Sequence, residues 1–440
     1  MVPNGWETRK LSTLGDGSKP AVKAGPFGSA IKKEYYVSSG YKVYGQEQVI
    51  ADDAFIGDYY IDEEKFQSLK SCSISPGDIL ISLVGTVGRV LLVPENAEPG
   101  IINPRLLRLS LCNSTVNGVY IKYFLETEHT KNTLNSWAQG GTMGVLNAEM
   151  LKSLNVPVPP LPEQRKIAQI LSTWDRSIAT TEKLIDASKQ QKKALMQQLL
   201  TGKKRLVDGS SFRKVREGFA VSKLGELPDD WNVELISKHY WYQEGPGVRK
   251  HQFTESGVKL FNGTNIQHSR INLANTSTYV SSDEAYGAYN HFLADSGDLV
   301  IACSGISVDR FDEKIAFINK EHLPLCMNTS TMRFKVKSET TACLTFMRYF
   351  MMSDLFKNQI RRQITGSAQL NFGPSHMAKC FIPLPSLEEQ KKIASVLSCA
   401  DKEVDVLEAK LAHFKQEKKA LMQQLLTGKR RVKVAEAEAA

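Results

Sequence analysis

The chain has 440 residues, of which 42% are hydrophobic and 23% are charged. This composition can bury cores in two or more domains, and it excludes a small disulfide-stapled peptide and a disordered tail. The formal net charge of +9 suits a polyanionic partner, but it equally suits plain solubility.

Seven cysteines are scattered along the chain without a Cys-x-x-Cys pair or closely paired histidines. This pattern indicates reduced thiols and argues against a disulfide framework or a structural zinc site. The longest apolar runs, such as Ile79–Val84, are far shorter than the roughly 20 residues that span a bilayer. With no signal peptide in the pattern, we expect a cytoplasmic protein with no membrane partner and no bound metal.

Residues 1–156 form the first predicted globular domain, because they are rich in glycine, β-branched residues and short apolar runs. Gly77-Asp78 followed by Ile79 is typical of a turn that leads into a buried strand. Trp6, near the start, is predicted as a core anchor rather than a stacking platform.

Residues 157–206 are predicted as a long helical segment. Proline punctuation at Pro157 to Pro160 stops any earlier helix, Pro162 suits a first helical position, and Gly202 suits a left-handed exit. Between them, apolar residues step by three and four, which is the seam of a coiled coil. The seam is Ile167, Leu171, Trp174, Ile178, Ile185, Leu195 and Leu199, with Thr181, Ser188 and Lys192 in the same register.

Residues 207–382 form a second predicted domain that resembles the first faintly. Pro228 and Trp231 parallel Pro3 and Trp6, and residues 296–301 parallel residues 76–81. We therefore interpret the second domain as a diverged copy of the first, again with mixed α/β content.

Residues 383–433 repeat the helical segment almost unchanged. At an offset of 226 residues, 24 of 43 positions from 163 to 205 are identical, which is far beyond chance. Ser386 and Glu389 have the spacing of a capping box, and Gly428 matches Gly202. Residues 434–440, rich in alanine and glutamate, are expected to be frayed. The second seam is Ile393, Leu397, Val404, Leu407, Leu411, Phe414, Leu421 and Leu425, with Ala400 and Lys418 in register.

Two matched seams favour mutual pairing of the helices over packing of each helix on its own domain alone. Each helix would be about 58 Å long at 1.5 Å per residue. Parallel pairing would require the intervening segment to travel that length back, so antiparallel pairing is favoured. The predicted fold class is α+β: two globular domains separated by two long helices that form an antiparallel coiled coil with pseudo-twofold symmetry.

Most of the net charge lies on the predicted helices, which carry +6 over residues 163–205 and +4 over residues 389–431. The globular domains are therefore close to neutral, and any affinity for nucleic acid must come from local patches. For the helices, a solvated coiled-coil face is favoured over direct contact with phosphate.

Three motifs carry a resemblance to a known family. They are the Leu-x-Glu-Gln-x-Lys-Ile-Ala start at residues 161–168 and 387–394, the Leu-Leu-Thr-Gly-Lys end at 199–203 and 425–429, and Gly25-Pro26-Phe27-Gly28-Ser29. With two unlike domains around them, these motifs make the whole chain resemble the specificity subunit of type I restriction-modification systems.

This resemblance implies a protein that carries no chemistry itself. Each target recognition domain would read one half of an asymmetric bipartite sequence in double-stranded DNA, and the helices would fix the unspecified gap. Two modification subunits would use S-adenosylmethionine to methylate adenine, and restriction subunits that use ATP and Mg would join for cleavage. The chain itself would bind no cofactor.

Motifs for chemistry are missing from the sequence. There is no Walker loop, no Gly-x-Gly-x-x-Gly after a strand and no Asn-Pro-Pro-aromatic motif, and Asn103-Pro104-Arg105 is only a superficial echo of the last. Asp312-Glu313-Lys314 resembles a nuclease pattern weakly, since such triplets are common on surfaces. We therefore expect no catalytic residue.

Candidate DNA contacts are polar residues in glycine-rich loops, because amide and guanidinium groups match base edges. Each of them could equally be solvated or cap a turn, and Arg105 and Arg333 could brace strands. The candidates are Ser29, Lys32, Lys33, Gln46, Gln48, Arg89 and Thr142 in the first domain, and Arg249, Lys250, Asn262, Thr264, Asn265, Ser367 and Gln369 in the second.

Two other functions compete with DNA reading. The chain could be a coiled-coil scaffold that organises protein partners without sequence readout, or an enzyme in its own right. The missing motifs disfavour the enzyme, and the salt dependence of duplex affinity separates the scaffold from the reader.

Overall fold

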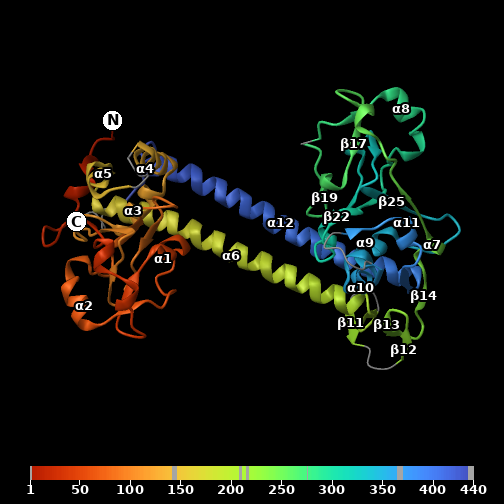
Figure 1. Ribbon diagram of the computed structural model, residues 1–440, viewed down its shortest axis with the longest axis horizontal. Helices are drawn as coiled ribbons and strands as arrows, with labels where there is room; N and C mark the ends of the chain where they lie inside the picture. Colours follow the sequence, from red (N-terminus) through yellow and green to blue (C-terminus); the bar gives the residue numbers. More distant parts are fainter. Residues whose placement is uncertain are drawn as a thin grey trace. The chain divides into compact units, whose positions relative to one another are not determined.

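The computed structural model describes residues 2–140, 146–207, 211–214, 218–274, 276–363 and 370–434. The chain divides into two compact units: Met1–Lys183 with Ala409–Ala440, and Leu184–Glu408. Each unit thus contains one globular segment and a part of both long helices (Figure 1). The boundary between the units therefore lies within the two long helices, and not where these helices meet the globular segments.

The globular part of the first unit is built on two small sheets. One is antiparallel with the order β2-β8-β5-β6, and the other has the order β4-β3-β7, with β3 and β7 parallel. A separate pair, β1 with β9, joins the two ends of the segment. The strands are β1 (Glu7–Lys10), β2 (Val22–Ala24), β3 (Tyr41–Tyr44), β4 (Tyr60–Ile61), β5 (Ile79–Ser82), β6 (Val90–Leu92), β7 (Gly100–Ile102), β8 (Leu106–Leu109) and β9 (Asn155–Val158). The short helices are α1 (Gln46–Ala51), α2 (Glu63–Ser68), α3 (Gly118–Glu126), α4 (Glu128–Gly140) and α5 (Ala148–Ser153).

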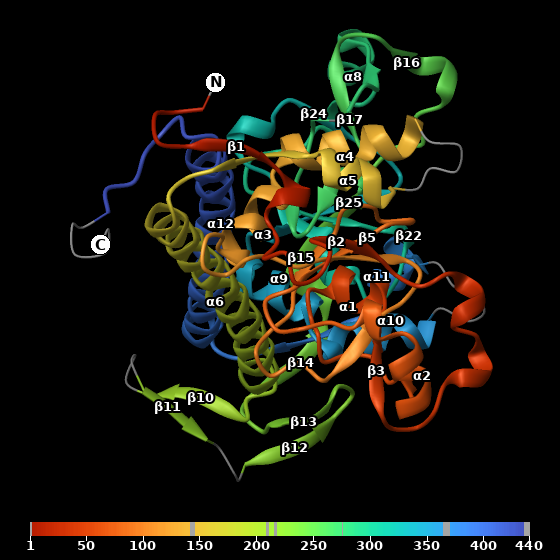
Figure 2. The same ribbon diagram turned by 90° about the vertical axis from the view of Figure 1, so that its left-hand side faces the viewer.

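The second unit repeats this topology with additions. Its sheets have the orders β15-β25-β21-β23 and β16-β20-β17-β24, with β17 and β24 parallel, and β14 pairs with β27. Two hairpins, β10 with β11 and β12 with β13, precede them (Figure 2). The strands are β10 (Lys204–Val207), β11 (Ser211–Lys214), β12 (Phe219–Ser222), β13 (Gly225–Pro228), β14 (Asn232–Leu235), β15 (Tyr240–Glu244), β16 (Phe253–Thr254), β17 (Val258–Phe261), β18 (Ile266–Gln267), β19 (Arg270–Ile271), β20 (Tyr279–Val280), β21 (Leu299–Ala302), β22 (Ser304–Ile306), β23 (Ile315–Phe317), β24 (Leu325–Met327), β25 (Thr331–Val336), β26 (Leu370–Asn371) and β27 (Phe381–Leu384). The short helices are α7 (Ile236–His239), α8 (Ser282–Tyr286), α9 (Leu344–Met352), α10 (Asp354–Gln363) and α11 (Pro374–Met377).

The two long helices are α6 (Leu161–Leu199) and α12 (Leu387–Leu425), each with 39 residues. Ser386 caps α12 as predicted, because its hydroxyl accepts the backbone N–H of Glu389 at 3.2 Å. Gly202 and Gly428 have φ of +67° and +72°, as the exits predicted. Among the described residues, no helix is long and apolar enough to cross a membrane.

The helices run antiparallel in both units. In the first unit, Asp175 and Glu182 of α6 pair with Lys418 and Lys415 of α12, at 2.5 and 2.7 Å. In the second unit, Lys189 and Lys192 pair with Glu408 and Asp401. Because residue numbers rise along one helix as they fall along the other, the predicted antiparallel pairing is confirmed.

Every predicted seam residue is buried or half-buried, as a seam requires. Trp174 and Phe414 meet edge to face, with ring centroids 5.5 Å apart. The ends of the helices also enter the globular cores. Ile167, Leu171, Leu425 and Leu426 lie in the core of the first unit, and Leu199, Leu200, Ile393 and Leu397 lie in that of the second. Both alternatives considered for the apolar stripes therefore occur: the helices pair with each other, and their ends pack on the globular domains.

Both predicted tryptophan anchors lie in these cores. Trp6 and Trp231 are 6% and 5% exposed. The Trp6 indole N–H donates to Glu163 at the start of α6 at 3.0 Å, and Arg431 bonds the same carboxylate at 2.7 Å. In the second unit, Arg205 bonds Glu389 at 2.6 Å. Each helix start is thus tied to the exit of the other helix.

A half-buried polar cluster joins a short helix to both long helices in each unit. The short helix is α3 in the first unit and α9 in the second. The Tyr123 hydroxyl donates to Asp175 at 2.5 Å, and the Tyr349 hydroxyl donates to Asp401 at 2.7 Å. Arg348 adds a bond to Asp401 at 2.9 Å. Burial alone would raise the pKa of the Asp401 carboxyl, but Lys192, Tyr349 and Arg348 outweigh it, and the pKa lies below its ordinary value.

Replacement of Asp401 by asparagine should lower the free energy of unfolding by about 2 kcal/mol at pH 7, because Lys192 and Arg348 lose a half-buried ionic partner. A carboxyl with a lowered pKa contributes stability above its unfolded pKa of about 3.9, and loses it as the pH falls through the folded pKa. The difference between wild type and Asp401→Asn in urea unfolding should therefore shrink below about pH 4.

Asp175 is the matched control, because it stands at the equivalent position with a side chain that is 43% exposed. Asp175→Asn should cost less than about 1 kcal/mol, as expected for a solvated ion pair. Equal losses at the two positions would contradict the argument from burial.

Candidate nucleic-acid interface

Three loops meet at one place in the first unit: the loop after β2, the turn before α1 and the turn between β7 and β8. The Gly25 N–H donates to the Leu106 carbonyl at 2.9 Å, and the Asn103 N–H donates to Tyr44 at 2.9 Å. A Cβ on Gly25 would lie 1.9 Å from the Asn103 carbonyl oxygen. Glycine is therefore required for the Gly-Pro loop to approach the Asn103 turn this closely.

The second unit builds the same junction from different residues. The Gly245 N–H donates to Thr331 at 3.1 Å, and the Asn328 N–H donates to Phe261 at 3.0 Å. A Cβ on Gly245 would lie 2.5 Å from the backbone of Asn328. Gly245 and Asn328 thus occupy the places of Gly25 and Asn103.

Seven of the predicted DNA contacts lie exposed on or near these junctions. Exposure is what a base or phosphate contact requires, and contact with DNA stays a prediction for all of them. The exposed residues are Ser29, Lys32, Lys33 and Arg89 in the first unit, and Arg249, Lys250 and Thr264 in the second.

Gln48 and Asn265 do not lie on exposed loops, which corrects the expectation for them. The Gln48 amide accepts the Gly45 N–H at 2.7 Å and donates to the Ile56 carbonyl at 2.9 Å. Asn265 accepts the Asn262 N–H at 2.9 Å and donates to the Thr276 hydroxyl at 2.7 Å. Both residues are nearly inaccessible, at 1% and 7% exposure, because they cap the turn three residues earlier.

Gln46 and Asn262 are half-buried. The Gln46 side chain donates to the Val84 carbonyl, which ties α1 to the loop after β5. The Asn262 amide donates to Leu260 at 3.2 Å and accepts from the Asn328 amide at 2.7 Å. The remaining predicted contacts, Thr142, Ser367 and Gln369, lie outside the described residues.

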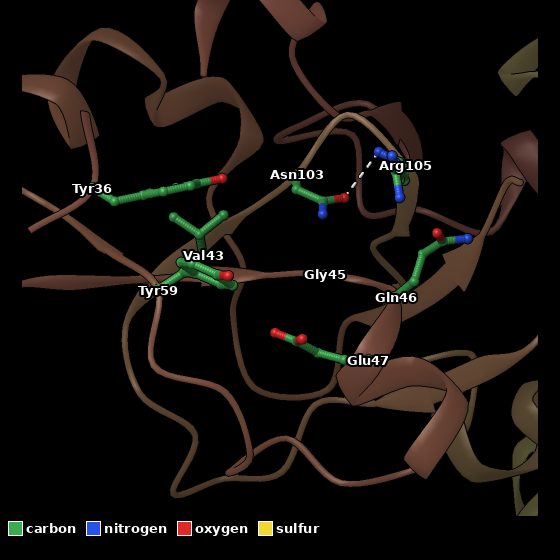
Figure 3. A pocket seen from close by; sticks show the side chains of 8 residues that line it. All are labelled: Tyr36, Val43, Gly45, Gln46, Glu47, Tyr59, Asn103 and Arg105. Atoms are coloured by element: carbon green, nitrogen blue, oxygen red, sulfur yellow. Dashed lines mark hydrogen bonds between the residues drawn. The ribbon is translucent and has the colours of Figure 1, made fainter. Parts of the chain in front are cut away.

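A pocket of about 200 Å³ opens at the junction of the first unit (Figure 3). Its walls combine aromatic and apolar groups with an amide, a carboxylate and a guanidinium. Tyr36, Tyr59, Glu47 and Arg105 were not among the predicted contacts, since their convergence depends on long-range strand pairing. The lining residues are Tyr36, Val43, Gly45, Gln46, Glu47, Tyr59, Asn103 and Arg105.

The electrostatics of the pocket are those of a partly desolvated site. Burial first, and then the neighbouring Tyr59 and Glu47, raise the pKa of the Tyr36 hydroxyl. The two tyrosine rings lie 4.8 Å apart between centroids. The Tyr36 hydroxyl therefore stays neutral near pH 7 and can both donate and accept hydrogen bonds.

Arg333 braces strands, which is one of the two roles predicted for it. Its guanidinium bonds the buried Asp298 at 3.1 Å and the His291 carbonyl at 2.8 Å. Arg105 differs, because its side chain is exposed at the pocket.

The Asp312-Glu313-Lys314 triplet shows no convergent arrangement. Asp312 pairs with Lys357, Glu313 pairs with Arg310, and Lys314 donates to the Ile266 carbonyl. Within the described part of the chain, no group of three His, Cys, Asp or Glu side chains could hold a metal ion.

A duplicated α+β unit with a loop junction, carried on two long antiparallel helices, defines a class of two-domain recognition proteins. The model of the type I restriction modification DNA specificity domain matches residues 3–189 and 236–416. The chain therefore belongs to the type I restriction-modification specificity subunits, and the resemblance of its motifs to this family is confirmed.

Individual relatives agree with this assignment. The type I restriction enzyme MjaVIII specificity subunit of Methanocaldococcus jannaschii is 28% identical over 438 residues, which cover 98% of this chain and 94% of the relative. A solved chain from work on the assembly and conformational transition of a type I R-M system has a TM-score of 0.57 at 15% identity, covering 98% and 100% of the two chains. The type I S subunit from M. genitalium has a TM-score of 0.53 at 14% identity, covering 97% and 96%. The two solved structures show that the fold is shared.

Replacement of Asn265 by alanine should destabilise the second unit by about 1–2 kcal/mol, because the Asn262 N–H and the Thr276 hydroxyl lose their partner. Thr264→Ala, at the exposed neighbour, should change stability by less than about 0.5 kcal/mol. Thermal unfolding of the two variants measures the difference. An Asn265→Ala protein of unchanged stability but altered DNA selection would show that Asn265 reads DNA rather than capping the turn.

Proposed function

We propose that this chain is the DNA-reading subunit of a type I restriction-modification complex, and that each unit reads one half of a bipartite, asymmetric target. The observation that carries the proposal is the loop junction, which occurs once in each unit with the same backbone contacts and different side chains. A common framework with variable loops is how one fold serves different recognition tasks.

The asymmetry of the target follows from the residues at equivalent places. Gly25-Pro26 leads to the exposed Ser29, Lys32 and Lys33, whereas Gly245-Pro246 leads to the exposed Arg249 and Lys250. All three residue types contact phosphate, and both lysine and arginine can bond guanine in the major groove, but only arginine presents a planar fork of donors for two parallel hydrogen bonds. Unlike side chains on the same framework therefore favour unlike half-sites.

The long helices are proposed to fix the gap between the half-sites. Each has 39 residues, so each is about 58 Å long. Their ends are held in the globular cores by Ile167, Leu171, Ile393 and Leu397. Paired helices that are anchored at their ends resist bending, which is what a constant gap between two read sequences requires.

Two modification subunits are the proposed partners for chemistry, and restriction subunits are proposed to join them for cleavage. In this proposal the partners supply S-adenosylmethionine, ATP and Mg, and this chain contributes target selection without a catalytic residue or a cofactor of its own. The complex would act in the cytoplasm, where the DNA is. Membership of the family supports this division of labour.

Selection from a randomised duplex pool, with the chain co-assembled with the modification subunits of its host, tests the function. We expect two short defined blocks at one constant separation, and an affinity that falls linearly in log–log plots against salt concentration as phosphate contacts are lost. An intact complex that enriches no sequence would favour a scaffold for protein partners instead.

A seven-residue insertion in both helices, after Lys183 and after Glu408, tests the proposed control of the gap. Each helix lengthens by about 10 Å, so the gap should grow by about three base pairs at 3.4 Å each, or binding should be lost. Both sites lie at the division between the units, which leaves the contacts within each unit intact.

A seven-residue extension after Val434, beyond both helices, is the control for added length. It should leave the selected gap unchanged. If the double insertion also kept the original gap at full affinity, the helices would not set the spacing.

A further inference from the structure

One difference between the two junctions lies beside the Asn103 amide, which lines the pocket of the first unit. Gly45 and Asn262 occupy equivalent places, because the N–H of each is accepted by the amide three residues later, on Gln48 or Asn265. Their backbones are both extended, with φ of −123° and −117°. The structural difference between the two positions is therefore the side chain.

In the second unit this side chain engages the asparagine of the next turn. The Asn262 amide oxygen accepts from the Asn328 amide at 2.7 Å. In the first unit, a Cβ on Gly45 would lie 3.0 Å from Nδ2 of Asn103, so the missing side chain leaves space beside that amide. Among the residues that the structure describes, Asn103 Nδ2 has no acceptor.

Asn103 is nevertheless held rigidly. Its N–H donates to Tyr44, its carbonyl accepts from Leu106, and its side-chain oxygen accepts the Arg105 N–H at 2.9 Å (Figure 3). The remaining donor, Nδ2, therefore faces the pocket in a fixed orientation. A preorganised donor without a partner among the described residues is suited to an external acceptor.

The other walls complement a planar heterocycle. Tyr36 and Tyr59 supply aromatic faces, and Figure 3 shows the Glu47 carboxylate and the Asn103 amide directed at the same space. A carboxylate accepts from an exocyclic amino group, and an amide N–H donates to a ring nitrogen. Adenine and cytosine carry these two groups side by side on the Watson–Crick edge. Guanine presents an N–H beside its amino group on that edge, and thymine has no exocyclic amino group.

We propose that this pocket takes one adenine or cytosine of the first half-site, displaced from the base stack. Glu47 and Asn103 bond the edge of the base, one of the two tyrosine rings stacks on its face, and Arg105, exposed at the rim, contacts the phosphate. A base that lies against a tyrosine ring cannot at the same time lie between its neighbouring bases, so the base must leave the stack. The proposal rests on the DNA-reading function proposed above.

Gly45→Asn tests the proposal, because it places in the first unit the residue that engages the equivalent asparagine in the second. The backbone already suits it, and the 3.0 Å contact is with the end of a side chain. In pool selection, the variant should lose the preference at one position of one block, keep the rest of both blocks, and bind the wild-type target about tenfold more weakly. Asn262→Gly is the matched control and should leave the first block unchanged.

Glu47→Gln tests the same pocket without filling it. This exposed side chain keeps its shape but loses its charge, so the same single position should become degenerate. With 2-aminopurine at that position of the target, wild type should change the fluorescence of the probe, because the base leaves the stack, and Gly45→Asn should not.

The outcomes separate the two proposals. If wild type selects two blocks and both pocket variants select them without change at any position, the base pocket is refuted and the reading function stands. The same holds if 2-aminopurine fluorescence is unchanged by wild type at every position of the first block. If wild type enriches no sequence, both proposals are overturned.

Discussion

The burial of helix ends inside the globular cores is the constraint on which the rest of this structure depends. Ile167 and Leu171 from the start of α6 and Leu425 from the end of α12 share one core with the sheets of the first unit. Ile393, Leu397 and Leu199 do the same in the second unit. A long polar helix gains little stability in isolation, so apolar packing at the ends and along the seam must hold it. Since one set of contacts anchors two helices at once, neither unit can form its core without both of them.

Charged groups give this packing its register. Asp175 and Asp401 each bring a tyrosine of the globular part and a lysine of the other helix together. Because a shift of one helix along the other would leave these carboxylates, and above all the less exposed Asp401, without their cations, such a shift is penalised. The same contacts occur at an offset of 226 residues, so both units use one solution for joining a globular segment to a helix pair.

The two loop junctions show how a duplicated framework acquires different surfaces. Backbone hydrogen bonds and tightly packed glycines hold the loops in both units, and these features do not depend on the side chains that face outward. Asn262 accepts from the Asn328 amide in the second unit, whereas Gly45, at the equivalent place, offers no side-chain acceptor to Asn103. One substitution within a rigid framework thus changes which polar group is available to a ligand without changing the fold.

Local periodicity and exact repetition determined the helices, their antiparallel pairing and the seam, because a coiled coil is encoded by residues three and four apart in the chain. The repeat also revealed the family, since its helical motifs are short and contiguous. Capping of the turns could also have been predicted from the sequence, because Gln48 and Asn265 follow the capped residue by three positions. The polar character of these residues suggested base contacts instead.

The pocket could not be predicted from the sequence. Tyr36, Tyr59 and Asn103 come from separate loops and Glu47 comes from α1, and the pairing of β3 with both β4 and β7 brings them together. Sequence by itself therefore determined the scaffold, whereas tertiary structure decided which polar side chains hold the fold and which remain available to a ligand, because that depends on long-range contacts that no local pattern records.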